Sequence, residues 1–193
     1  HHKDMKRTTI LTAALIILAA CNNKKSENPI AVQQQLKDTI VYEHEYLVKV
    51  GDMAPEFTLK YTNGTEFSLS AQRGKVVMLQ FTASWCGVCR REMPHIESEI
   101  WQRHKDHPQF VLVGVDREET KDVVDAYTQK VGTTYPMALD TAANAFASYA
   151  LRQSGITRNV LINRDGTIVK LTRLYNEDEF NSLVQSIDSL LAK

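Results

Sequence analysis

The sequence predicts an α/β protein with a mixed central sheet flanked by helices. Continuous apolar runs at residues 76–81 and 110–115 have the length and composition of buried strands. Segments with the 3.6-residue period of amphipathic helices follow both runs. A strand–turn–strand pattern and a last amphipathic segment close the chain. This order of elements is typical of a mixed sheet with helices on both faces.

The elements before the first buried strand form an N-terminal β extension. Apolar residues alternate over residues 57–61 and 67–69, and Asn63-Gly64 between them is a strong hairpin turn signal. The segment from Gly51 to Pro55 is predicted to be a turn or loop before this hairpin. Residues 30–50 fit a short helix plus a strand, or an added edge strand. The pattern does not choose between these two alternatives.

Helices and strands alternate after residue 85. A helix begins at the cysteine pair, and we expect a kink in it because Pro94 lies beyond its first turn. The remaining predictions are a helix at 120–131, a short strand or extended piece at 135–139, a short helix at 142–151, a hairpin of 160–162 with 167–171, and a closing helix at 177–191.

The first 20 residues are typical of an export signal. Lys6 and Arg7 precede the apolar run 10–20, which is too short for a membrane-spanning helix of about 20 residues. Leu18-Ala19-Ala20-Cys21 resembles a bacterial lipobox, which implies cleavage before Cys21, lipidation of that residue and anchoring to a membrane. A plain secretory signal with an incidental cysteine is the alternative. We therefore predict a lipoprotein signal peptide at 1–20, a tether and N-terminal extension at 21–50, and the main domain at 51–193.

The charge of the processed chain argues against nucleic acid as a partner. Cleavage would remove three of the 23 basic residues and one of the 23 acidic residues, which leaves a formal charge of −2. Nucleic-acid-binding proteins usually carry a basic excess. The processed chain would still be long enough for one domain with a sizeable core.

The central motif is Trp85-Cys86-Gly87-Val88-Cys89, between a predicted strand and a predicted helix. Cys86 would lie at the helix start, where free N–H groups and the helix dipole favour a thiolate. Cys89, one turn later, could attack a mixed disulfide formed at Cys86. The motif thus predicts dithiol–disulfide exchange, although a purely structural disulfide is an alternative.

Metal and haem binding fit the cysteine pattern poorly. Structural zinc usually needs four Cys or His ligands, and Cys21 is the only further cysteine. Arg90 follows Cys89, where covalent haem attachment would need a histidine. We therefore expect no metal and no cofactor.

The motif and its surroundings resemble the thioredoxin fold, and specifically the membrane-tethered TlpA/ResA-like thiol-disulfide oxidoreductases, relatives of the AhpC/TSA–Redoxin superfamily. The similarity covers about residues 51–190 and is carried by residues 51–59, 74–77, 81–94, 110–116, 134–136 and 161–166. It implies a thioredoxin-like domain at 51–193, with Cys86 as the attacking cysteine, Cys89 as the resolving one, a Cys86–Cys89 disulfide, and Trp85 beside the exposed thiol.

The same resemblance implies partners and a location. Substrates would be protein thiols and disulfides, and a membrane-embedded donor would restore the dithiol. The domain would be held in the cell envelope by its lipid anchor and face the periplasm. Reduction of disulfides, for instance in cytochrome c maturation or more generally, is the direction that the family suggests, while the residues leave oxidase and isomerase roles open.

Two positions depart from the family pattern. Thr157 stands where the family usually places a cis-proline, and we predict a trans peptide bond before it because a cis bond there costs about 2.5–4 kcal/mol. The Thr157 hydroxyl could donate a hydrogen bond toward a thiolate. Arg158 could add positive charge and lower the pKa of Cys86, or it could point to solvent as arginines mostly do.

The second departure is Gln80, which stands where thioredoxin carries a buried acid. A neutral amide cannot serve as the general base for the resolving thiol. Glu92, Glu97 or a water molecule could take that role. Charges on the helix surface are the favoured interpretation of the two glutamates.

Two other functions fit parts of the pattern. A threonine followed by arginine before a strand also resembles peroxiredoxins, so a peroxiredoxin-like thiol peroxidase is the principal alternative. The close cysteine pair and Trp85 match the oxidoreductase pattern better. A lipoprotein binding module with a vestigial fold is the other alternative, and the presence of both cysteines argues against it.

Overall fold

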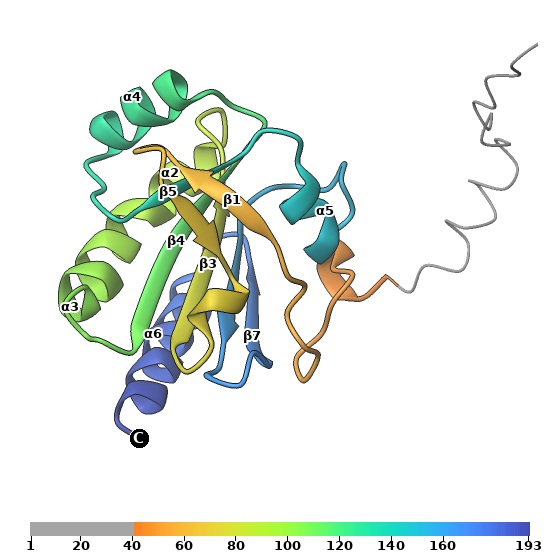
Figure 1. The fold of residues 1–193 in the computed structure, drawn as a ribbon, viewed down its shortest axis with the longest axis vertical. Helices are drawn as coiled ribbons and strands as arrows, with labels where there is room; N and C mark the ends of the chain where they lie inside the picture. Colours follow the sequence, from red (N-terminus) through yellow and green to blue (C-terminus); the bar gives the residue numbers. More distant parts are fainter. Residues whose placement is uncertain (1–40) are drawn as a thin grey trace, which may run out of the picture. The chain divides into compact units, whose positions relative to one another are not determined.

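One seven-stranded sheet organises the part of the chain that the structure describes. The computed structural model describes residues 41–193 (Figure 1). The proposed signal peptide, Cys21 and most of the predicted tether lie outside these residues. The sheet order is β2-β1-β5-β4-β3-β6-β7. The strands are β1 (Thr58–Tyr61), β2 (Glu66–Ser68), β3 (Val76–Thr82), β4 (Phe110–Arg117), β5 (Met137–Asp140), β6 (Arg158–Ile162) and β7 (Ile168–Arg173).

The centre of the sheet is parallel and its edges are antiparallel. β3, β4 and β5 run in the same direction, and β1, β2, β6 and β7 join antiparallel neighbours. All seven residues of β3 are buried, as expected for a strand covered on both faces. In the pairing with β6, Gln80 lies opposite Asn159 and Phe81 opposite Arg158. This register places the end of β3 beside the start of β6.

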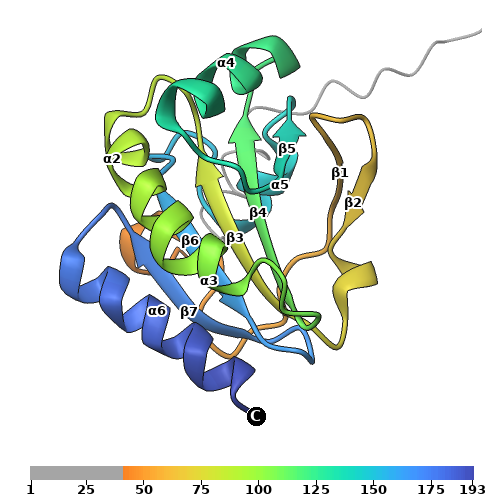
Figure 2. The ribbon, with the colours of Figure 1, turned by 90° about the vertical axis from the view of Figure 1, so that its left-hand side faces the viewer.

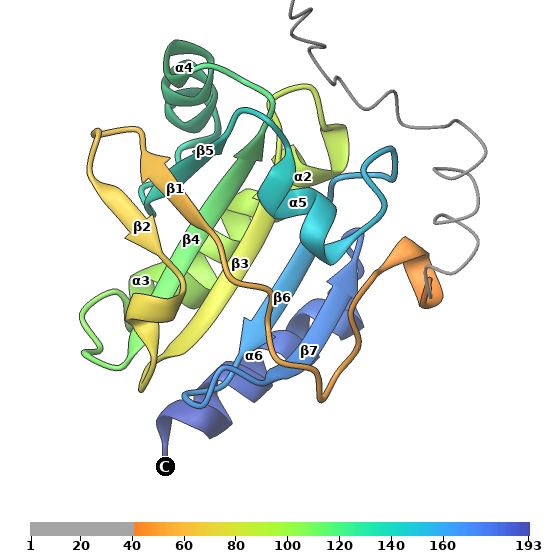
Figure 3. The same ribbon diagram turned by 45° about the vertical axis from the view of Figure 1, so that its right-hand side comes forward.

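Helices cover both faces of the sheet. α2, α3, α4 and α6 lie on one face (Figure 2), and α5 lies on the other (Figure 3). The helical elements are η1 (Glu43–Glu45), η2 (Ser70–Gln72), α2 (Gly87–His95), η3 (Ile96–Trp101), α3 (Gln102–His104), α4 (Lys121–Val131), α5 (Asn144–Tyr149) and α6 (Glu177–Leu191). Within residues 41–193 no helix is long and apolar enough to cross a membrane.

Alternate residues of the central strands pack in two different hydrophobic cores, one on each face of the sheet. Val77, Leu79 and Phe81 of β3 pack in the core with α5, which also includes both cysteines of the motif. Val76 and Met78 pack in the core with α2, α4 and α6. This separation follows from the two-residue period of a strand. The cysteine pair thus lies where β3 ends between the two cores.

The structure confirms the predicted mixed sheet with helices on both faces and its N-terminal hairpin. α6 has the predicted bounds, whereas β4 and β6 extend into polar residues and α5 is shorter than predicted. α5 begins late because the Asp140 carboxylate accepts the backbone N–H groups of Ala145 and Phe146. The expected disturbance near Pro94 is a change from α-helix to the π-helical turn η3.

The predicted extension at 30–50 is described only from residue 41. Residues 41–50 contain η1 and an isolated bridge between Tyr46 and Ala150, rather than a continuous edge strand. Tyr46 and Val48 are buried in the core that includes α5. Burial of these two side chains and backbone hydrogen bonds to the C-terminal end of α5 hold this segment on the domain.

Candidate functional site

Cys86 and Cys89 lie at the junction of β3 and α2. Cys86 is the N-cap residue of α2, and its Sγ accepts the backbone N–H of Cys89 at 3.1 Å. The two residues form a disulfide, with a Cα–Cα distance of 5.3 Å. The helix N-terminus offers N–H groups and a positive dipole end to a sulfur anion. This position therefore favours a thiolate at Cys86 after reduction.

The two cysteines differ in their exposure to solvent. Cys86 is 7 % exposed, whereas Cys89 is completely buried. Trp85, directly before Cys86, is 57 % exposed. Cys86 is therefore the more exposed of the two cysteines, and the exposed Trp85 side chain directly precedes it.

Thr157 completes the immediate surroundings of the disulfide. Its Oγ1 lies 3.1 Å from Cys86 Sγ and 3.3 Å from Cys89 Sγ. Thr157 is buried, and no peptide bond within residues 41–193 is cis, which confirms the prediction of a trans bond before it. A hydroxyl within reach of both sulfurs can donate a hydrogen bond to whichever one carries negative charge.

Arg158 lies inside the protein and not in solvent. Its side chain is completely buried, with Cζ 4.4 Å from the ring centroid of Tyr46 and 5.9 Å from that of Phe146. Nη2 donates to Ser154 Oγ at 3.0 Å and lies 3.9 Å from a carboxylate oxygen of Glu45. Burial lowers the pKa of Arg158, but a guanidinium stays charged in proteins. The solvent-facing alternative is thus wrong, because aromatic rings cover this cation.

Gln80 is buried on β3 and hydrogen-bonded within the core. Its Oε1 accepts the Tyr135 hydroxyl at 2.6 Å. Glu92, on the buried face of α2, accepts a hydrogen bond from Asn159 Nδ2 at 2.6 Å. A neutral amide and a carboxyl group therefore lie together next to the start of β6.

The expectation of a surface position is wrong for Glu92. Its side chain is only 1 % exposed. Burial raises the pKa of Glu92 to about 7, although hydrogen bonds from Asn159 and Gln80 oppose this shift. Glu97 is half-buried, and its carboxylate accepts hydrogen bonds from the backbone N–H and the hydroxyl of Thr134. The hydrogen bond from Asn159 lowers the free-energy cost of burying the Glu92 carboxyl group. Asn159 belongs to β6, and the residue pattern of α2 alone does not reveal a partner on another element.

Comparison with known proteins assigns the family. The Redoxin family model matches residues 49–187. The chain belongs to the Redoxin family.

Sequence relatives of the chain are thiol-disulfide oxidoreductases. The chain is 32% identical over 124 residues to the thiol-disulfide oxidoreductase ResA of Bacillus subtilis, which covers 64% of this chain and 67% of the relative. It is 27% identical over 186 residues to ResA of Geobacillus kaustophilus, covering 96% of this chain and 98% of the relative. The chain is accordingly a ResA-like thiol-disulfide oxidoreductase of the thioredoxin family, as its sequence predicted.

Solved structures agree with this assignment. A candidate protein disulfide isomerase from Bacteroides thetaiotaomicron is 58% identical, with a TM-score of 0.76 over 79% of this chain and 96% of that one. A candidate DsbE-type thiol:disulfide interchange protein from Chlorobium tepidum is 26% identical, with a TM-score of 0.65 over 75% of this chain and 99% of that one. The fold is therefore thioredoxin-like.

The Redoxin-family site includes a carboxyl pair that sequence reasoning missed. Asp116 is completely buried at the carboxyl end of β4, and burial together with the nearby Glu119 carboxylate raises its pKa to about 9. Glu119 accepts the backbone N–H and the hydroxyl of Ser84, each at 2.6 Å. These contacts fix the turn before Trp85. A polar residue directly after an apolar parallel strand was the available signal.

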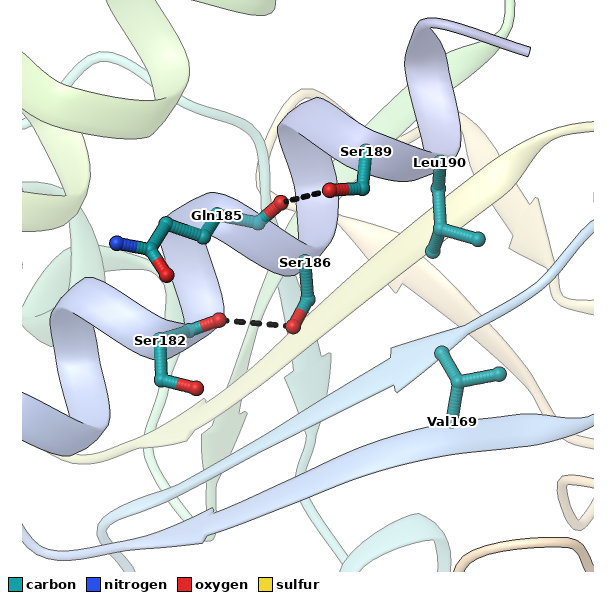
Figure 4. A pocket seen from close by; sticks show the side chains of 6 residues that line it. All are labelled: Val169, Ser182, Gln185, Ser186, Ser189 and Leu190. Atoms are coloured by element: carbon teal, nitrogen blue, oxygen red, sulfur yellow. Dashed lines mark hydrogen bonds between the residues drawn. The ribbon is translucent and has the colours of Figure 1, made fainter.

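Two surface clefts of this Redoxin-family protein differ in their relation to the cysteines. A groove of about 480 Å³ between α2 and α4 includes Ser84 and Arg90 near the motif. A cleft of about 370 Å³ lies between α6 and Val169 of β7, toward the opposite end of the sheet (Figure 4). There Ser186 and Ser189 donate to backbone carbonyls of α6, so these hydroxyls serve the helix. Within residues 41–193 no three His, Cys, Asp or Glu side chains are grouped to hold a metal ion.

Proposed function

We propose that this oxidoreductase reduces protein disulfides in the cell envelope, with Cys86 as the attacking and Cys89 as the resolving cysteine. The difference in exposure between the two cysteines carries the proposal: Cys86 is 7 % exposed and Cys89 is completely buried. Cys86 also has the helix N-terminus and two hydrogen-bond donors beside it, the Cys89 N–H and the Thr157 hydroxyl. Both factors favour its thiolate over the thiol.

In the first step the Cys86 thiolate attacks one sulfur of the substrate disulfide. A mixed disulfide forms between Cys86 and the substrate, and the other substrate sulfur leaves as a thiolate that takes up a proton. The exposed Trp85 indole offers an apolar surface to the substrate segment beside this bond. The cysteine pair at this stage has one free thiol, that of Cys89.

In the second step Cys89 loses its proton and attacks Cys86 Sγ. The mixed disulfide breaks, the second substrate sulfur leaves as a thiolate, and the Cys86–Cys89 disulfide closes. Two electrons have then passed to the substrate. Glu92 is the proton acceptor that we assign, because it follows Cys89 by one turn on the buried face of α2 and because its pKa is raised to about 7.

Thr157 and Asn159 support this assignment of Glu92. Thr157 directly precedes β6 and Asn159 is the second residue of that strand, so the residue that contacts the sulfurs and the residue that binds Glu92 are two positions apart in the chain. Thr157 contacts both sulfurs, and Asn159 donates to Glu92. One short segment of the chain thus contacts both the sulfurs and the Glu92 carboxyl group.

The dithiol must be restored after each cycle. We assign this step to a membrane-embedded dithiol donor, which passes two electrons and two protons to the Cys86–Cys89 disulfide. Lipidation of Cys21 would hold the domain near that donor on the periplasmic side, and several acyl chains bind a membrane far more firmly than one. The lipobox-like Leu18-Ala19-Ala20-Cys21 supports this location.

Turnover of a model disulfide protein, driven by an added dithiol reductant, tests the proposal. Cys86→Ser should abolish this turnover, because no thiolate remains to attack. Cys89→Ser should instead accumulate a mixed disulfide with the substrate, visible on a non-reducing gel. Full activity of Cys86→Ser would refute the assignment, and rapid catalytic peroxide consumption by Cys89→Ser would favour the peroxidase alternative. Ser98→Ala, on the exposed face of the same helical region, serves as the control.

A further inference from the structure

The loop between α5 and β6 presents Thr157 to the cysteines without the rigidity of a proline. A proline ring would fix the φ angle at this position, whereas threonine leaves φ free to vary. A hydroxyl group stabilises a thiolate only if its oxygen stays at hydrogen-bond distance from the sulfur. Thr157 Oγ1 is at 3.1 and 3.3 Å from the two sulfurs. Other contacts must therefore hold the loop.

Arg117, at the end of β4, holds this loop from one side. Its Nη1 donates to the backbone carbonyls of Arg152 and Ser154, at 3.2 and 3.1 Å. The guanidinium lies over two rings, with Cζ 4.6 Å from the centroid of Phe146 and 5.3 Å from that of Trp85. Only 8 % of Arg117 is exposed. One side chain thus connects the loop with the tryptophan next to Cys86.

Arg158 holds the same loop from the other side. Its Nη2 donates to Ser154 Oγ at 3.0 Å. The guanidinium also lies over Phe146, so both arginines share that ring. Ser154 is therefore bound twice, at its carbonyl by Arg117 and at its hydroxyl by Arg158. It precedes Thr157 by three residues.

We propose that Arg117 and Arg158 form a buried clamp on Ser154 that keeps the Thr157 hydroxyl within reach of both sulfurs. The inference rests on the proposed function of Cys86 and adds positioning residues to it. Preorganised donors stabilise a developing anion without a reorganisation cost at the moment of reaction. The Thr157 carbonyl also accepts hydrogen bonds from the Leu174 N–H at 3.2 Å and from Arg173 Nη1 at 3.3 Å. Together with these bonds the clamp supplies the rigidity that a proline would give, and Thr157 keeps a hydroxyl that proline lacks.

A double-mutant cycle on the Cys86 thiol tests the clamp. Thr157→Val removes the hydroxyl at nearly constant volume and should raise the pKa of Cys86 by about one unit. Arg117→Met and Ser154→Ala should each raise this pKa in the wild-type background. Neither should raise it further in the Thr157→Val background, because the hydroxyl that the clamp positions is already gone. The readouts are thiolate absorbance of the reduced protein and its reduction potential against glutathione.

Each other outcome contradicts the clamp. Additive shifts would mean that the arginines act on Cys86 by their charge alone. An unchanged pKa in Arg117→Met and Ser154→Ala would mean that they only support the fold. If Arg117→Met does not fold, Ser154→Ala and Arg117→Lys carry the same test.

Arg164→Met is the matched control. This half-buried arginine also donates to a backbone carbonyl, that of Leu190, but it lies between β6 and β7 at the opposite end of the sheet. It should leave the pKa of Cys86 unchanged. Loss of disulfide turnover in every protein, with the coupling intact, would refute the proposed function and leave the clamp standing.

Discussion

Glu92 is a buried carboxyl group with no cationic partner among residues 41–193. It accepts a hydrogen bond from Asn159, and burial raises its pKa to about 7. The folded protein therefore keeps a proton on Glu92 at pH values where the unfolded chain, with a pKa of about 4.5, has lost it. The resulting stability is fully present below about pH 4.5 and is lost as the pH rises through about 7.

Glu92→Gln should change both stability and turnover. A glutamine side chain does not ionise, so the variant avoids the cost of a buried negative charge above pH 7, and its amide oxygen can still accept the hydrogen bond from Asn159. The variant should therefore be more stable than the wild type at pH 8 by up to about 3 kcal/mol. The difference should vanish near pH 4, as measured by urea unfolding across this range. Turnover at neutral pH should fall by about 100-fold because the general base is lost. Wild-type turnover should increase as Glu92 ionises near pH 7, and the variant should lack this increase.

Glu99→Gln provides the control for this prediction. Glu99 lies in the same helical region, is half-exposed and binds His95. Its substitution should leave both pH profiles as they are. Equal pH profiles for Glu92→Gln and the wild type would remove Glu92 from the resolving step.

At the scale of elements, the segment from η1 to Val48 completes the surroundings of Arg158. The Tyr46 ring covers the guanidinium, and the Tyr46 hydroxyl donates to the Thr172 carbonyl at 2.7 Å. The backbone of this segment hydrogen-bonds to the chain at the C-terminal end of α5: the Leu47 N–H donates to the Tyr149 carbonyl, and the Glu45 carbonyl accepts the Leu151 N–H. This segment precedes the predicted domain at 51–193 in the sequence, and it nevertheless contributes to the packing around Arg158.

Two substitutions of Tyr46 separate its contributions to stability. Tyr46→Phe keeps the ring over Arg158 and loses one buried hydrogen bond, so it should cost about 1 kcal/mol. Tyr46→Leu also loses the cation–π contact, which adds about 1–2 kcal/mol. Denaturant unfolding measures both values. Equal costs for the two variants would show that the ring over Arg158 contributes nothing.

The sequence predicted elements whose signals are local. α6 has the expected bounds because its apolar spacing lies within the helix and its cap, Asn176, directly precedes it. The position of Cys86 at a helix start followed equally from neighbouring residues. The burial of Glu92 and Arg158 was beyond such reasoning, since it depends on Asn159 and Tyr46, which reach them from other elements. Residue type alone predicts an exposed position for both charges.

At the scale of the whole molecule, the three cysteines have separate tasks in our proposal. Cys86 and Cys89 follow the end of β3, and Cys21 lies in the N-terminal region of the sequence that leads to the domain. An anchor in one region and a redox pair in another allow the domain to face the periplasm while it stays at the membrane. The two chemistries should therefore be separable by mutation.

Cys21→Ala should abolish incorporation of labelled fatty acid and release the protein from the membrane fraction, because acyl chains supply the binding free energy. Reductant-driven turnover by the purified variant should equal that of the wild type. Cys89→Ala is the matched control and should keep its label. Label retained by Cys21→Ala would place the lipid elsewhere or disprove anchoring through this residue.

The neighbourhood of Trp85 and Cys86 also has an optical consequence. A disulfide accepts an electron from an excited indole and so quenches its emission. Trp85 adjoins the Cys86–Cys89 disulfide, whereas Trp101, the only other tryptophan, lies farther along the helical region and donates its Nε1 to Thr134. Fluorescence should therefore brighten on reduction, and Trp85→Phe should remove most of that change. The protein carries its own spectroscopic reporter of its redox state.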